Sequence, residues 1–100
     1  MIHEHHTFAL TDGVTQDDFL VADERVQQEF APFQPGFVRR TTARSMHGGS
    51  WLVAWIWSDP ASLDAASAAG SESDAVEAFR ACIDTESEAR ASYQTREWLA

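Results

Sequence analysis

The chain has 100 residues, 44% of them apolar, and a formal net charge of −9 at pH 7. This length suits one domain, and the apolar share together with four tryptophans excludes a disordered chain. The negative charge argues against nucleic acid and anionic membranes as partners, because both would repel the chain. The N-terminus lacks a signal-peptide pattern, and no apolar run reaches the roughly 20 residues that cross a bilayer. We therefore expect a soluble, cytoplasmic protein. The sequence has no lysine and no asparagine but many Ala and Asp residues, which suggests a GC-rich bacterial genome.

The first half of the chain predicts a strand, a helix and a second strand. Residues 5–11 alternate in polarity, which is typical of a half-buried strand. Thr15 is a suitable cap for a helix over residues 16–31, where apolar side chains recur at helical spacing. Prolines and a glycine close this helix, and residues 37–45 predict the second strand.

The second half predicts a third strand, a helical region and a fourth strand. Residues 51–57 are nearly all apolar, so we expect a strand that is covered on both faces. Asp59 is expected to cap a helix, and a second helical segment is expected to begin near Ser73. Residues 86–94 predict a more polar strand near an edge of the sheet, and residues 96–100 a short tail.

The order of these elements is β-α-β-β-α-β. This order predicts an α+β fold in which a four-stranded antiparallel sheet carries both helices on one face. The opposite face would be bare in a monomer, and a large apolar surface is usually covered. We therefore expect a homodimer in which two such sheets pair as a barrel.

Three segments resemble the antibiotic biosynthesis monooxygenase-like branch of the dimeric α/β-barrel superfamily. They are the Pro-Gly-Phe that opens the second strand (35–37), the aromatic third strand that ends in Trp-Ser-Asp (57–59), and the Ser-Asp-Ala that opens the last helical segment (73–75). The resemblance implies a single ferredoxin-like domain over residues 1–100. It also implies a pocket within each subunit, between the helices and the sheet.

The expected pocket takes its walls from the first and third strands. By alternation, His6 shares a face with the apolar residues of the first strand, and Trp57 shares a face with Trp55 on the third. Arg39 and Arg40 lie on opposite faces of the second strand, so one of them is expected to neutralise an anionic substrate oxygen. We take His6, Trp57 and Arg39 as candidate catalytic residues. The expected binding residues are Phe8, Leu10, Val53, Trp55, Phe79, Arg80 and Tyr93.

Each of these residues also has a purely structural alternative to its proposed functional role. Tryptophans at every second position of a strand usually pack in a core, and we expect this for at least one of Trp51, Trp55 and Trp57. His6 could be a buried, hydrogen-bonded histidine with no catalytic role. Tyr93 could equally pack at the end of its strand.

No metal or cofactor is expected. The N-terminal histidines lack further ligands at metal-site spacing. All seven basic residues are arginine, which removes Schiff-base lysine chemistry. Haem-degrading relatives place an iron-ligating histidine where this chain has Arg80, and arginine cannot ligate iron. Cys82 is expected to pack rather than to react.

The resemblance implies an enzyme, most simply a cofactor-independent monooxygenase of bacterial secondary metabolism that acts on an aromatic or polyketide-type molecule. In such an enzyme His6 would remove a proton, and the resulting carbanion would reduce O₂ without metal or flavin. The alternatives are a non-catalytic ligand-binding or stress-associated protein, and a polyketide cyclase on the same scaffold. A cavity of a few hundred Å³ beside His6 and Trp57 would favour an enzyme, whereas a packed interior would argue against one.

Overall fold

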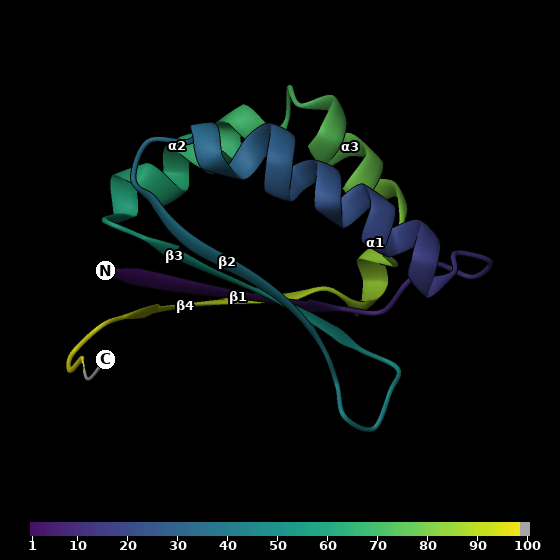
Figure 1. The fold of residues 1–100 in the computed structure, drawn as a ribbon. Helices are drawn as coiled ribbons and strands as arrows, with labels where there is room; N and C mark the ends of the chain where they lie inside the picture. Colours follow the sequence, from purple (N-terminus) through teal and green to yellow (C-terminus); the bar gives the residue numbers. More distant parts are fainter. Residues whose placement is uncertain (99–100) are drawn as a thin grey trace.

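Four antiparallel strands form one sheet, and the helices cover one of its faces (Figure 1). This computed structural model describes residues 1–98, so the last two residues of the expected tail lie outside the described residues. The strand order is β2-β3-β1-β4, which confirms the expected α+β, ferredoxin-like fold and puts β4 at an edge. The strands are β1 (Ile2–Phe8), β2 (Phe37–Arg44), β3 (Trp51–Trp57) and β4 (Ala89–Gln94).

Within residues 1–98, the helical layer contains three α-helices together with short π-helical and 3-10 segments. The helix expected over residues 16–31 is α-helical only as far as Arg25 and continues as a π-helix, in which Ala31 N–H bonds to the carbonyl of Val26. Apolar spacing alone does not distinguish these two hydrogen-bond patterns. The helical elements are α1 (Gln16–Arg25), η1 (Val26–Phe30), η2 (Ala31–Phe33), α2 (Pro60–Gly70), α3 (Asp74–Ala81) and η3 (Thr85–Ser87). No helix within residues 1–98 is both long and apolar enough to cross a membrane.

Local capping chemistry sets the helix starts as expected. The Thr15 side chain accepts a hydrogen bond from Asp18 N–H, and the Asp18 side chain accepts one in return from Thr15 N–H. Asp59 caps α2, with Pro60 at the first helical position, and Ser73 caps α3.

β1 and β4 have different boundaries from those that the sequence predicted, because strand pairing determines where they begin and end. β1 pairs with all of β3, from Ile2 opposite Trp57 to Phe8 opposite Trp51, so it begins and ends three residues earlier than the alternation indicated. β4 begins at Ala89 because the three preceding positions of the expected strand belong largely to the η3 turn.

A bulge near the start of β2 decides which side chains face the helices. Phe37 pairs with Trp57, and Arg39 pairs with Ile56, so two steps on β2 match one step on β3. Phe37 and Arg40 therefore both face inward, while Arg39 faces outward.

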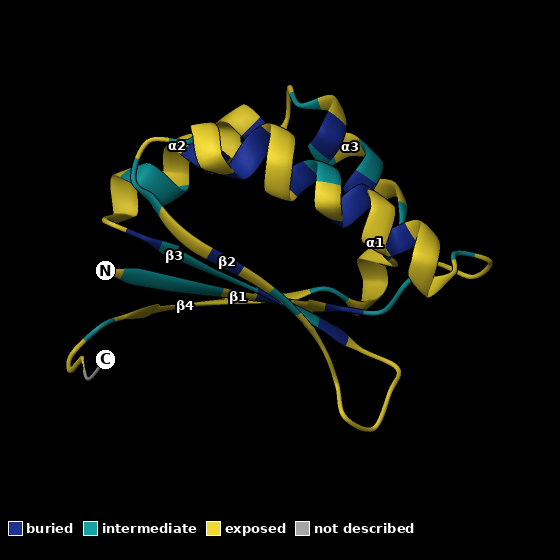
Figure 2. Cartoon of the chain, viewed as in Figure 1, coloured by how far each residue is buried: buried dark blue, intermediate teal, exposed yellow. Residues whose placement is uncertain are grey.

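One core lies between the helices and the inner face of the sheet, as the buried segments in Figure 2 show. Phe8 from β1 packs edge-on against Phe19 of α1 and Phe79 of α3. The outer face of the sheet is uncovered in the single chain, since Leu52, Ala54 and Ile56 of β3 are only partly buried. A dimer that covers this face stays a prediction.

Candidate functional site

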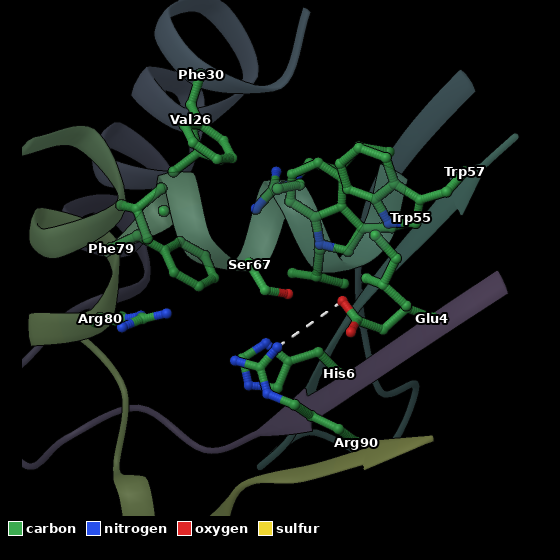
Figure 3. A pocket seen from close by; sticks show the side chains of 16 residues that line it. Glu4, His6, Val26, Phe30, Trp55, Trp57, Ser67, Phe79, Arg80 and Arg90 are labelled. Carbon is green, nitrogen blue, oxygen red and sulfur yellow. Dashed lines mark ion pairs between the residues drawn. The ribbon is translucent and has the colours of Figure 1, made fainter. Parts of the chain in front are cut away.

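A cavity of about 80 Å³ lies between the helical layer and the inner face of the sheet (Figure 3). Its lining comes from all four strands and from η1, α2 and α3. Apolar and aromatic side chains make up much of the wall, and His6, Glu4 and three arginines bring charge or hydrogen-bonding capacity to it. This is the location that the resemblance implies for a pocket.

Two stacked indoles form one wall of the cavity. The rings of Trp55 and Trp57 lie 5.0 Å apart at an angle of 15°, and Phe37 contacts both edge-on. Trp57 is 2% exposed, and its Nε1–H has no hydrogen-bond acceptor within residues 1–98. Buried indole N–H groups usually have a partner, so this donor is an uncommon feature of the cavity wall.

His6 is buried on the inner face of β1, at 3% exposure, and it lines the same cavity. Its Nε2 lies 3.2 Å from Glu88 Oε1, and its ring packs against Phe8. Burial lowers the pKa of His6 below the ordinary 6.5, and the positive charge of Arg90 lowers it further, while Glu88 opposes both. The imidazole is therefore neutral near pH 7 and can accept a proton.

Arg40, not Arg39, is the arginine of β2 that reaches the cavity. Arg40 Nη2 lies 2.8 Å from Asp23 Oδ1 in a buried ion pair, and Nη1 donates to Gln27 Oε1 at 2.7 Å. The guanidinium lies 4.9 Å from the centre of the Trp55 ring. Arg39 is exposed on the outer face, so the expectation that placed it in the site is wrong, and the bulge in β2 is the physical reason.

Glu4 and Arg90 stand at the edge of the cavity beside His6 (Figure 3). Their closest charged atoms, Oε1 and Nη1, are 3.8 Å apart. Burial raises the pKa of Glu4, although Arg90 opposes the shift. Sequence reasoning missed both residues. The signal that could have found them is the register of β1 and β4, which sets Arg90 directly opposite His6.

The other expected binding residues divide between the cavity, the core and the outer face. Val53 and Phe79 line the cavity, and the exposed Arg80 does so from α3. Phe8 does not line it, because its ring is held in the aromatic core. Leu10 lies beyond the end of β1, where it pairs with Ile83.

Tyr93 lies on the outer face of the sheet, so placing it in the pocket is wrong. It is 55% exposed and packs edge-on against His5, which also faces outward. The physical reason is its register: Tyr93 pairs with His3, whose side chain points away from the helices.

The N-terminal histidines do not converge on one point. His3 Nε2 lies 2.7 Å from Thr95 Oγ1, His5 packs on Tyr93, and His6 contacts Glu88. Within the part of the chain that the structure describes, no three His, Cys, Asp or Glu side chains are grouped to hold a metal ion.

Solved structures with similar folds include two enzymes of Streptomyces. SnoaB of Streptomyces nogalater, a cofactor-independent oxygenase, is 22% identical with a TM-score of 0.80, covering 98% of this chain and 95% of its own. The monooxygenase ActVA-Orf6 of Streptomyces coelicolor, solved with nanaomycin D, is 18% identical with a TM-score of 0.76, covering 99% of this chain and 90% of its own.

A third similar structure comes from outside Streptomyces. A candidate antibiotic biosynthesis monooxygenase of Chloroflexus aurantiacus is 16% identical with a TM-score of 0.73, covering 100% of this chain and 98% of its own. No protein-family model matches the sequence, and no curated protein matches it. At these identities the likeness concerns the fold. The chain therefore has the ferredoxin-like α+β fold of the antibiotic biosynthesis monooxygenase-like proteins.

Proposed function

We propose that this chain is a cofactor-independent monooxygenase of bacterial secondary metabolism that oxidises an aromatic or polyketide-type substrate. The observation that carries the proposal is a buried histidine that lines the same cavity as two stacked indoles. Flat aromatic walls suit planar ring systems. The similar folds of SnoaB, a cofactor-independent oxygenase, and of ActVA-Orf6, solved with nanaomycin D, support the same reaction class.

His6 would act as the general base on an acidic methylene or phenol of the substrate. Loss of this proton gives a carbanion, which adds O₂ and forms a peroxide after proton uptake. Elimination of water from the peroxide leaves a carbonyl, so one methylene and one O₂ yield one carbonyl and one water. The carbon is oxidised by four electrons and O₂ is reduced by four, and the substrate itself is the only reductant.

Trp57 and Arg40 would stabilise the negative charge that develops. The Nε1–H of Trp57 has no acceptor within residues 1–98, and it would donate to a substrate oxygen once the surrounding side chains move to admit the substrate. Arg40 replaces Arg39 in the proposed role of neutralising an anionic oxygen, because it lines the cavity. The cation also lies over the Trp55 ring.

The cavity of about 80 Å³ is smaller than the roughly 300–1,000 Å³ of typical small-molecule sites. A substrate of two or three fused rings therefore requires side chains at the edge to move. Arg80 and Arg90 are both exposed and can swing outward without breaking core contacts. The same small volume is the observation that favours the second candidate, a non-catalytic protein that holds a small ligand.

Oxygen consumption tests the reaction. The purified protein is incubated with an anthrone or a quinol, without added metal or flavin, and O₂ uptake is recorded together with the product. His6→Gln is expected to lower kcat by about 10²–10⁴-fold, the usual contribution of a general base. His5→Gln is the matched control, because His5 faces away from the cavity and should leave the rate unchanged.

Two results separate the candidates. The oxygenase proposal would be refuted if no such substrate causes O₂ uptake. Ligand-induced changes in tryptophan fluorescence that persist in His6→Gln would then support a non-catalytic binding protein. Equal rates for His6→Gln and the wild type would remove His6 as the base.

We also propose that a second copy of the chain covers the outer face of the sheet. Leu52, Ala54 and Ile56 of β3 form a central apolar strip on this face and are only partly buried in the single chain. Sedimentation of the wild type and of Ile56→Glu tests the proposal. A dimer that dissociates in the variant is expected, and a monomeric wild type would refute it.

A further inference from the structure

Glu88 contacts His6 without lining the cavity. It lies at the end of η3, just before β4, and it shares the inward face with Arg90, which pairs directly with His6. Its Oε1 is 3.2 Å from His6 Nε2, and its side chain is 28% exposed, against 4% for His6. His6 thus contacts Glu88 and also lines the cavity.

This contact dictates where the imidazole carries its proton. An ionised carboxylate can only accept hydrogen bonds, so Nε2 must be the protonated nitrogen that donates to Glu88. In a neutral imidazole the other nitrogen, Nδ1, then holds a free lone pair. No group within residues 1–98 hydrogen-bonds to Nδ1. His6 lines the cavity, so this lone pair is the one that would meet a bound molecule.

The backbone around Glu88 is fixed on both sides. Asp84 N–H donates to the carbonyl of Ala9 at 3.0 Å, and Ala9 N–H donates to Ser87 Oγ at 2.8 Å. These bonds join η3 to the chain just after β1. β4 then pairs with β1 beginning at Ala89. Glu88 is thus held between two attachments to the segment that carries His6, and its carboxylate needs little ordering to meet the ring.

We propose that Glu88 is a positioning residue that fixes His6 as the Nε2–H tautomer and so makes Nδ1 the proton acceptor of the site. The base role of Nδ1 rests on the proposed function, whereas the tautomer does not. A third group that orients a catalytic histidine is a recurring device, because a histidine in the wrong tautomer cannot accept the substrate's proton.

Several charged groups surround His6 and shift its pKa in opposite directions. Arg90 faces it from β4, Arg40 from β2 and Glu4 from its own strand, with Arg80 of α3 in the same cavity lining. Both burial and the arginines oppose a charged imidazole, and Glu88 is the group that favours it. Removing the carboxylate should therefore lower the pKa of His6 as well as free its tautomer.

Nitrogen NMR of the imidazole tests the tautomer without any substrate. Long-range ¹H–¹⁵N spectra of uniformly ¹⁵N-labelled protein are recorded from pH 4 to pH 9, and His6 is assigned from its absence in His6→Gln. We expect a bare Nδ1 and a protonated Nε2 in the wild type. In Glu88→Ala we expect a mixture of tautomers and a lower His6 pKa.

Two further variants separate orientation from charge and from general damage. Glu88→Gln can still accept from Nε2–H through its amide oxygen, so it should keep the tautomer and lower the pKa of His6. Glu86→Gln removes an exposed carboxylate of η3 and should leave both unchanged. Thermal unfolding of each variant shows that the fold is retained.

The inference is overturned by a protonated Nδ1 in the wild type, or by one unchanged tautomer in Glu88→Ala. Oxygen uptake is measured in parallel, where Glu88→Ala should lower kcat at least tenfold and move the pH profile to lower pH with little change in KM. If the wild type consumes no O₂, the proposed function fails, and the spectra still decide the role of Glu88.

Discussion

Removing the charge of Asp23 should cost the protein a large part of its stability. Asp23 and Arg40 form an ion pair at 2.8 Å, and their side chains are 8% and 1% exposed. Thr42 Oγ1 donates to Asp23 Oδ2 at 2.8 Å. Burial lowers the pKa of Arg40, an effect that the Asp23 carboxylate opposes. The guanidinium thus depends on that carboxylate for its charge compensation.

Asp23→Asn keeps the shape of the side chain and leaves Arg40 as an unpaired buried cation. Breaking one side of a buried pair typically costs about 3–5 kcal/mol, and the remaining bond from Arg40 to Gln27 places the expected loss near the lower end. For a domain of this size, a loss of about 3 kcal/mol lowers Tm by roughly 12–24 °C. Urea unfolding followed by tryptophan fluorescence measures it, since Trp51 and Trp57 are buried.

Two comparisons make this prediction decisive. The double variant Asp23→Leu with Arg40→Met removes both charges and should recover most of the loss, because apolar replacements of buried pairs are often neutral. Glu29→Gln breaks the exposed pair between Arg25 and Glu29 and should change nothing measurable. A cost below about 1 kcal/mol for Asp23→Asn would refute the reasoning, since that is the range of exposed pairs.

Gly36→Ala should lower the free energy of unfolding in urea by more than Gly49→Ala does. Both glycines have positive φ, where a side chain costs about 1–2 kcal/mol. Only at Gly36 would the added methyl also overlap Ser62 Oγ. Equal losses would exclude the steric clash. Glu4→Gln should raise the free energy of unfolding at pH 7. Burial raises the pKa of Glu4 above 4.5 in the folded state, so the wild type loses stability as pH rises through that pKa, and the advantage of the variant should vanish below pH 4.5. No gain at pH 7 would contradict this. The pKa of His6 is lowered in the folded state, so the unfolded chain binds the proton first and the free energy of unfolding falls as pH drops below 6.5. His6→Gln should remove this loss. The same dependence of stability on pH in the variant and the wild type would contradict the prediction.

The elements that depend on near neighbours in the chain were predictable. The capping box between Thr15 and Asp18 involves residues three apart, and Asp59 and Pro60 are adjacent. Such contacts form wherever the local sequence allows them, so the helix starts follow from the residue types.

The face of the sheet that a strand side chain occupies could not be predicted from that strand alone, because it also depends on how the strand pairs with its neighbours. Alternation from the inward Phe37 places Arg39 inward, and only the pairing with β3 shows the extra residue that turns Arg40 inward instead. Charged residues on strands are usually taken to face solvent. Glu88 and Arg90 acquire an inward role through the register of β4 against β1, which joins segments more than eighty residues apart.

The space between helices and sheet divides into two regions with different roles. Around Phe8, Phe19 and Trp51 it is filled by aromatic rings at centroid distances of 4.8–5.7 Å, which gives the domain its apolar core. Towards Trp57 the same strands bring His6 and Arg40 inward, where apolar side chains would pack at lower cost. A small domain has little stability to spare. Within residues 1–98, this inner face carries a buried ion pair, a buried histidine and an unpartnered indole N–H, and these polar groups support the proposal of a binding site here.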